Sequence, residues 1–425
     1  MAVSFDARFL GRWARQRNLR LLAHSRRIVF VMLPLGAFTG WMMGLAVKAY
    51  SVVFSWTDEH LVPNHLVLLL PLLGLPLATM LLDVSRVGEV SLSEDVHLSR
   101  ANPFQAFPFR KSLVKVVACF ATIFLGGSAG LEGPAKWFGG AVGLQCHRAL
   151  SWLSRPIRLL RRLKTEAATM VVGGAAGAIS SVFRAPLSAA LYAAEHEGVL
   201  QTRTLIPTLV SAAAGYLVFA AMVGHEPLLA LPRSYVLRWR EIWVALPLGI
   251  SCGLVSSFFG GATATFRRRL AWIPLRWRGF AGGIGLSLMM IPGHLLFPHL
   301  PTLRGGGVEV VNHLIQTPAD LRVALILLAV KVIGTALTLG CGGIGGTWLP
   351  AVCMGACLGS AFDAVLLPSY PGLLTMLGAT ALAGAFNGTI LVPVVFLAET
   401  TAQAPLVVPA LVATTVAYLV ARDWS

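Results

Sequence analysis

Two segments of the chain place glycine and proline close together, and one of them adds a carboxylate. Gly130–Pro134 reads GLEGP and Gly346–Pro350 reads GTWLP. Proline is well tolerated in the first turn of a helix, because the N–H group that it lacks has no partner there. Each segment is therefore predicted to start a helix, with free N–H groups and a partial positive charge. Glycine lets such a backbone approach a ligand closely, so the two segments predict an anion site built without cations.

The candidate anion-binding residues are those at the two predicted helix starts: Gly130, Leu131, Gly133, Gly346, Thr347, Trp348 and Leu349. A lysine or arginine would bind a transported anion too tightly for rapid release, whereas amide dipoles suit conduction. The alternative is that these glycines only allow close helix packing. Two such segments, each before a proline, favour the anion site.

Glu132 lies two residues before Pro134, at the predicted helix start. The amides that bind an anion there also stabilise a carboxylate, so the side chain and the anion compete for one site. Protonation would cancel that attraction and release the side chain. Glu132 is therefore the candidate gate and proton acceptor. The plainer interpretation is an acidic residue that only caps the helix.

The composition indicates that these segments lie in a membrane. Of 425 residues, 56% are hydrophobic and 12% are charged, and the mean hydropathy is +0.74. Soluble domains carry about 25% charged residues, and no polar linker divides this chain. The expected fold class is an all-α membrane protein. A carboxylate inside such a protein is functional by default, because its burial is costly.

Long apolar runs alternate with short ones. A bilayer span needs about 20 residues. The runs that approach or exceed this length are Ile28–Phe54, Leu66–Leu82, Ile206–Val223, Ile242–Phe259 and Arg322–Leu339. The shorter runs are Val114–Leu125, Ala168–Ile179, Pro186–Ala194, Leu349–Phe362 and Thr389–Ala398. Broken helices at membrane depth need protein or a water-filled cavity to satisfy their backbone, and transport sites concentrate at such breaks.

Basic residues cluster in short connections. The formal net charge is +16, and arginines crowd residues 8–27 and 155–162. Basic loops next to membrane spans follow the positive-inside rule, so the N-terminus is predicted to be cytoplasmic. This distribution excludes nucleic acid as a partner. Residues 1–27 are predicted to form a basic helix that lies on membrane lipid.

The stretch Leu113–Gly143 repeats as Ala329–Gly359 without a gap. The matched pairs include Lys115 and Lys331, Thr122 and Thr338, Gly130 and Gly346, and Pro134 and Pro350, each 216 positions apart. Chance matching of common residues does not explain this register. The chain is predicted to contain two related halves, residues 28–225 and 226–425. The number of spans leaves open whether the halves are parallel or inverted.

Three segments resemble motifs of the CLC family of chloride channels and proton/chloride antiporters. GLEGP is similar to the family's GREGP motif, with Leu131 at the arginine position, and GTWLP is similar to GxFxP. Val182–Glu195 resembles the FNAPLAGxLFxxEE segment. The resemblance implies that Glu132 is the gating glutamate and that the amides of Thr347 and Trp348 coordinate a central anion. It also implies a homodimer, inverted halves, a chloride-type anion as cargo, no cofactor and no enzymatic activity.

Several features depart from the family pattern. No GSGIP motif, the source of the family's pore serine, is recognisable, and Ser91 and Ser93 are the nearest candidates. His196, next to Glu195, stands where antiporters have an internal glutamate, so this pair is the candidate proton relay. The final pore tyrosine and CBS domains are expected to be absent. A short chain of this kind is expected in a bacterial inner membrane.

Parts of the sequence are compatible with other functions. Within transport, the alternatives are an uncoupled chloride channel and a fluoride/proton antiporter. An intramembrane serine hydrolase is a distant alternative, because GGSAG around Ser128 fits a nucleophile pattern but has helical flanks. No catalytic residue and no metal site is predicted, because Cys353 and Cys357 lack a second ligand pair. Lys115 and Lys331 are expected to extend to a membrane interface.

Overall fold

The computed structural model describes residues 7–423, apart from residues 64, 89–104, 106, 196–201, 230–234, 237, 297–302, 318 and 367–371. Within this part of the chain the regular structure is helical, and extended pairing is limited to one isolated β-bridge. The all-α fold expected from the composition is confirmed.

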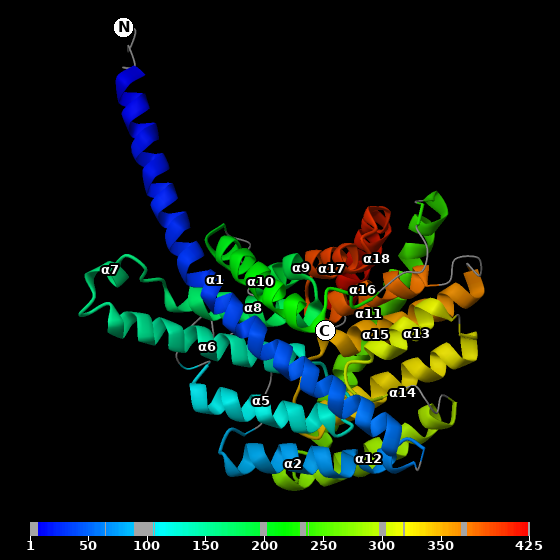
Figure 1. Cartoon of the computed structure of the whole chain (residues 1–425). Helices are drawn as coiled ribbons and strands as arrows, with labels where there is room; N and C mark the ends of the chain where they lie inside the picture. Colours follow the sequence, from blue (N-terminus) through cyan, green and yellow to red (C-terminus); the bar gives the residue numbers. More distant parts are fainter. Residues whose placement is uncertain are drawn as a thin grey trace.

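The first half contains α1 (Ala7–His60), η1 (Leu66–Leu69), α2 (Pro71–Val84), α5 (Phe109–Phe124), α6 (Glu132–Leu153), α7 (Arg158–Arg161), α8 (Ala167–Phe183), α9 (Pro186–Glu195) and α10 (Thr202–Val223). One continuous helix, α1, joins the basic N-terminal segment to the first apolar run, and its N-terminal part stands away from the other helices (Figure 1).

The second half contains α11 (Trp239–Arg269), α12 (Leu275–Leu296), α13 (Val308–Gln316), α14 (Leu321–Gly340), α15 (Trp348–Leu366), α16 (Leu373–Asn387), α17 (Leu391–Thr401), η2 (Ala404–Leu406) and α18 (Val407–Asp423). In both halves, helices of span length are interleaved with helices of 10–17 residues. The mixture of complete and interrupted helices predicted from the apolar runs is therefore present.

Seven helical segments of the described chain are long and apolar enough to cross a membrane. One of them, α15, was expected to be too short, and that expectation is wrong. Asp363 ends the apolar run in the sequence, but the helix continues to Leu366. The Asp363 carboxylate is buried because it accepts hydrogen bonds from the backbone at the start of α16, including Thr375 N at 2.9 Å.

Glycines bring the helices of each half into close contact in the same way. Gly139 of α6 lies against the backbone of Gly174 in α8, and Gly355 of α15 lies against Gly378 in α16. A Cβ at any of these glycines would overlap a carbonyl group of the facing helix. Small residues at such crossings allow the backbone contacts on which membrane helix packing depends. The same helix pair is thus built twice.

Matched helices of the two halves run in opposite directions. Figure 1 shows α6 and α15 leaving the centre of the molecule in opposite directions, α6 toward the side of α7 and α15 toward the side of α13. Opposite directions for these matched helices are what an inverted arrangement predicts. It also makes the starts of α6 and α15 face each other across the centre.

A pair of carboxylates repeats the inverted relationship at α9 and α17. Glu195, at the end of α9, accepts hydrogen bonds of 2.9–3.1 Å from three N–H groups at the start of α17. Glu399, in α17, accepts bonds of 2.8 and 2.6 Å from two N–H groups at the start of α9. Each helix therefore caps the other, since a carboxylate satisfies free N–H groups and complements the helix dipole.

Lys331 does not reach a membrane interface, so that expectation is wrong. Its side chain is fully buried, and Nζ donates to the carbonyl oxygens of Leu303 and Gly305 at 3.1 and 2.8 Å. Lys115 is also buried, with Nζ 5.4 Å from the centre of the Trp137 ring. Position in a repeat does not specify the direction of a long side chain, and here tertiary partners decide it.

Candidate anion-binding site

The two glycine-proline segments meet at the centre of the molecule. Gly130 N donates to Gly346 O at 2.8 Å, and Gly346 N donates to Gly130 O at 2.9 Å. These two residues form the isolated antiparallel bridge of the fold. The sequence predicted that the segments form one site, and the structure adds that their backbones are hydrogen-bonded to each other.

Two threonines hold the approaches to this bridge by equivalent contacts. Thr338 Oγ1 accepts from Ser128 N at 3.1 Å, and Thr122 Oγ1 accepts from Ile344 N at 3.3 Å. Each hydroxyl also donates to a carbonyl of its own helix, at 2.8 Å for Thr338 and 3.0 Å for Thr122. Each half therefore fixes the loop of the other half.

Ser128, the candidate nucleophile of the hydrolase alternative, belongs to this framework. Its side chain is fully buried, and its hydroxyl lies 2.8 Å from the hydroxyl of Thr335. It stands in a helix–loop–helix context rather than the strand–turn–helix context that a nucleophile elbow requires. These contacts give Ser128 a structural role.

Glu132 is the first residue of α6, and its side chain is 1% exposed. The carboxylate extends to the opposite helix, where Leu349 N donates to Oε1 at 3.1 Å. Oε2 has no hydrogen-bond partner among the described residues. Pro134 and its repeat mate Pro350 lie in the first turns of α6 and α15, so both predicted helix starts are confirmed within two residues.

Glycine is required on both sides of the Glu132 carboxylate. A Cβ on Gly130 or on Gly346 would overlap the carboxylate atoms. A Cβ on Gly133 would lie 2.6 Å from Gly346 N, so this glycine lets the two helix starts approach each other. The structure therefore brings together Gly130, Glu132, Gly133, Gly346 and Leu349, as the sequence predicted.

The arrangement has a chemical consequence. The N-terminus of α15 presents N–H groups and a partial positive charge to a single negative group in a water-poor environment. At present that group is the carboxylate of Glu132. A small anion has the same requirement for N–H donors, so it fits where the carboxylate now lies once the side chain moves away.

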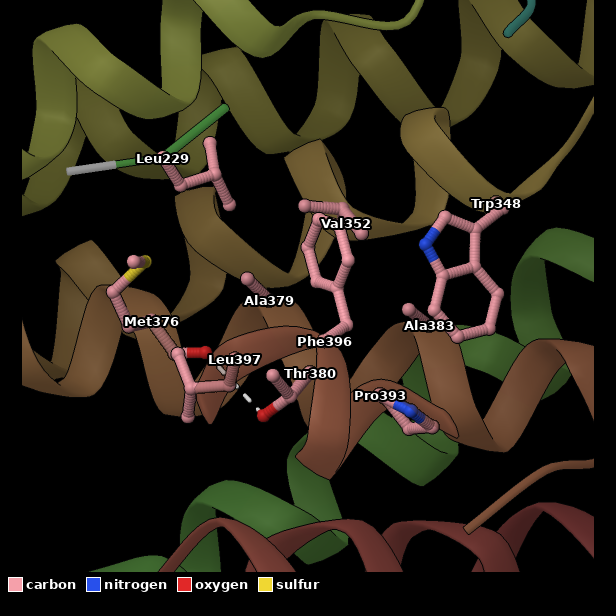
Figure 2. Close-up of a pocket in the computed structure, with 10 residues that line it drawn as sticks. All are labelled: Leu229, Trp348, Val352, Met376, Ala379, Thr380, Ala383, Pro393, Phe396 and Leu397. Atoms are coloured by element: carbon pink, nitrogen blue, oxygen red, sulfur yellow. Dashed lines mark hydrogen bonds between the residues drawn. The ribbon is translucent and has the colours of Figure 1, made fainter. Parts of the chain in front are cut away.

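Trp348, the first residue of α15, closes one side of the site. Its ring is fully buried, 5.5 Å from Phe183 and 5.4 Å from Tyr192 between ring centres. Figure 2 shows Trp348 and Phe396 in the lining of a narrow pocket that is mainly apolar and has no room for water, and their ring centres lie 6.3 Å apart. This apolar packing fixes the backbone of α15 at the point where its amides meet Glu132.

A polar pair close to the site was missed at the level of sequence. Lys136, one helical turn after Glu132, is buried, and its Nζ lies 5.9 Å from the centre of the Tyr192 ring. A lysine four residues beyond a functional acid on an apolar helix was the available signal. Its partner on α9 was not predictable, because the contact joins distant parts of the chain.

Four of the predicted residues are not seen at the site, three of them because the structure does not describe them. Ser91, Ser93 and His196 lie outside the described residues. Glu195 is described, but its carboxylate binds the start of α17 rather than extending to Glu132. The contact between α9 and α17 that occupies it has no local signal in the sequence.

A wide cavity approaches the site from one end of the molecule. Its volume is about 340 Å³, and its lining includes Leu131 and Leu349. Leu131 precedes Glu132, and Leu349 supplies the N–H group that binds the Glu132 carboxylate. The cavity therefore reaches two residues that adjoin Glu132, although Glu132 itself is not part of its lining.

Comparison with known proteins agrees with this geometry. The family described as the voltage gated chloride channel matches residues 88–422. The H(+)/Cl(-) exchange transporter ClcA of Salmonella arizonae is 26% identical, with 99% of this chain and 91% of that protein covered. A slow cyanobacterial Cl-/H+ antiporter has the same fold, with a TM-score of 0.79 at 20% identity over 93% of this chain and 94% of that chain.

A CLC-type fluoride/proton antiporter is also similar, with a TM-score of 0.74 at 22% identity over 94% of this chain and 96% of that chain. The family match covers far more than half of the chain. It includes nearly all of the second half, the first half from residue 88 onward, and both glycine-proline segments. The chain belongs to the voltage-gated chloride channel family, the CLC family of channels and antiporters.

Proposed function

We propose that the chain carries chloride across a membrane by a pathway between the starts of α6 and α15, with Glu132 as gate and proton acceptor. One observation supports this assignment above the others. The Glu132 carboxylate, on one half, accepts a hydrogen bond from the helix start of the other half. A side chain that occupies an anion site inside the protein can be displaced by an anion or removed by a proton.

The proposed cycle uses only this chain's groups. When Glu132 takes up a proton, its negative charge disappears and its attraction to the amides of α15 weakens. The neutral side chain then leaves Leu349 N, and chloride takes its place among the N–H donors. When the proton is released, the carboxylate returns and displaces chloride. The anion and the ionised carboxylate therefore exclude each other at one position, so entry and exit of chloride are linked to uptake and release of a proton by Glu132.

The wider setting is part of the same proposal. Basic residues in the connections of the first half support a cytoplasmic N-terminus, and the bacterial origin of similar exchange transporters supports a bacterial plasma membrane. Membership of the family supports a homodimer in which each subunit has its own pathway. The relay role of Glu195 is less well supported, since its carboxylate already caps α17. A relay through His196 stays a prediction.

Flux from liposomes tests the proposal. Purified protein is reconstituted with internal chloride, and efflux is recorded with a chloride electrode and a pH electrode together. Efflux is expected to rise as the pH falls, because protonation opens the gate, and proton uptake is expected to accompany it. Parallel loading with fluoride or nitrate measures selectivity. Absence of flux for all three anions would overturn the proposed function, and chloride flux without proton movement would indicate an uncoupled channel.

Glu132→Gln is the variant that tests the gate. The amide resembles a protonated carboxyl group, so passive chloride flux is expected to persist while its pH dependence and proton coupling disappear. Glu166→Gln is the matched control, because Glu166 is exposed and its side chain makes no capping hydrogen bond at the start of α8. Unchanged pH dependence in Glu132→Gln would remove this residue from the mechanism.

A further inference from the structure

The cavity above the anion site is formed by elements from both halves. Its wall includes Tyr50 of α1, the segment after α10 and the start of α13, and its inner end is formed by Leu131 and Leu349. In Figure 1, α13 lies on the opposite side of the molecule from the basic helix α7. An anion that reaches Glu132 from this side passes through the cavity.

Arg184 places a positive charge in this cavity. It follows the last residue of α8 in the left-handed conformation, with φ +50°, and its side chain is half-buried. Nη1 donates to the carbonyl oxygen of Glu226 at 3.1 Å, and the guanidinium carbon lies 5.8 Å from the centre of the Phe219 ring. The described hydrogen bond uses one of the five N–H donors of the guanidinium.

The lining is chemically asymmetric. Arg184 is the cation among the described residues that line the cavity, and Glu226 and Glu309 are its acids. Glu226 is exposed, on the segment after α10. Glu309 lies in the first turn of α13, where Lys331 and Arg304 are close enough to offset its charge. Neither of these two cations lines the cavity. Lys331 binds backbone carbonyls, and Arg304 binds Asp58.

The position of Arg184 also relates to Leu131. In the motif that GLEGP resembles, arginine stands at the position of Leu131. Here Leu131 and Arg184 line the same cavity, although 53 positions separate them. The chain thus supplies a guanidinium to the approach of the gate from the end of α8 instead of from the start of α6.

We propose that Arg184 captures the transported anion in the cavity, one step before the anion displaces Glu132. The ligand class is a small monovalent anion, held by the guanidinium and by water that the cavity has room for. Glu226 acts in the opposite sense, lowering the local anion concentration and preventing tight retention. This inference rests on the proposed function, because it specifies where the pathway of that function begins.

The expected effect is on apparent affinity rather than on maximal rate. A fixed charge at the mouth of a pathway changes the local concentration of a charged ligand by roughly tenfold or more at low ionic strength. For a half-buried guanidinium opposed by an exposed acid, we expect Arg184→Gln to raise the apparent KM for chloride about fivefold. The maximal rate is expected to stay within about twofold, because Glu132 and the amides of α15 are untouched.

Variants of opposite charge make the test decisive. Glu226→Gln is expected to lower the KM about threefold, and Arg184→Lys to retain most of the wild-type affinity. Arg86→Gln is the matched control, because Arg86 is also left-handed, with φ +53°, follows α2 and does not line this cavity. All shifts are expected to shrink when an impermeant salt raises the ionic strength, since screening shortens the range of the charge.

Chemical modification of a cysteine at position 184 restores or reverses the charge in one folded variant, so it separates the effect of charge from any effect on folding. Arg184→Cys is expected to raise the KM, and a membrane-impermeant thiol reagent carrying a quaternary ammonium group is expected to lower it again. A reagent carrying a sulfonate is expected to raise it further. Arg86→Cys with the same reagents is the control.

Two failures are distinguishable. If wild-type protein moves no anion, the proposed function fails. If wild-type protein moves chloride but the KM is the same in Arg184→Gln and Glu226→Gln, or the two reagents act alike on Arg184→Cys, only the capture role of Arg184 is overturned.

Discussion

The starts of α6 and α15 are repeat mates with different side chains on a shared backbone. The residue 216 positions after Glu132 is Trp348, and the residue 216 positions after Gly133 is Leu349. Both helices have proline in the first turn, and both loops are fixed by a threonine of the other half. One half supplies an acid that extends across the centre, and the other supplies the amide that receives it.

This difference shows how a duplicated structure acquires a direction. Two identical helix starts would present equivalent amides to an anion from both sides. Replacing one side chain by a carboxylate and the other by a fully buried indole gives one start a titratable group and the other a fixed wall. The backbone geometry is common to both helix starts, and the difference between the two side chains places a titratable group on one of them only.

The largest expected effect comes from Gly133. Gly133→Ala would place a methyl group 2.6 Å from Gly346 N, and backbone atoms cannot move aside without breaking the bridge. Overpacking of this kind costs about 3 kcal/mol, so we expect most folded protein and most flux to be lost. Size-exclusion chromatography and liposome flux measure this loss.

A glycine with open space around it provides the control for Gly133. Gly261 of α11 has no atom within 4 Å of an added Cβ, so Gly261→Ala is expected to retain folded protein and flux. A well-folded, active Gly133→Ala would contradict the close approach of the two helix starts.

The second effect concerns the reciprocal caps. Glu195→Gln and Glu399→Gln each weaken charged hydrogen bonds to helix N-termini, with an expected cost of about 1 kcal/mol each. Thermal unfolding in detergent measures both. Proton coupling distinguishes the two residues further. If both act only as helix caps, the two variants are expected to couple proton and chloride transport equally. A selective loss of coupling in Glu195→Gln would indicate that Glu195 is also a proton relay.

The smallest effect is expected at the paired threonines. Thr122→Val and Thr338→Val each remove the acceptor of one buried loop N–H, at a cost of about 1 kcal/mol. Because the two contacts are equivalent, the two losses in unfolding temperature are expected to agree. A large difference between the two losses would show that the two threonine contacts contribute unequally to the stability of the site.

The sequence was most informative where local pattern and function coincide. Gly130, Pro134 and their mates predicted two helix starts, and the constant register predicted that these starts belong to one site. The apolar runs predicted most spans, because burial in lipid leaves a simple compositional signal. Glu132 was identified because an acid at a helix start inside a membrane has few structural uses.

The remaining features depend on contacts that no local pattern records. The cap of Asp363 on α16 lengthened α15 beyond its apolar run. The burial of Lys331 depends on carbonyl groups at Leu303 and Gly305. Arg184 enters the cavity because α8 ends in a left-handed residue next to the segment that follows α10. In each case one polar side chain binds a group that is distant in the sequence.

The hydrogen-bonded pair of Gly130 and Gly346 limits how this protein can change its access to the two sides. Many carriers rock one half against the other around a central site. Here the halves are hydrogen-bonded to each other at their midpoint, beside the Glu132 carboxylate, so separating them would break main-chain bonds in a dry interior. In the proposed cycle, opening therefore falls to the movement of the Glu132 side chain, and turnover is expected to depend on how often that side chain gains and loses a proton.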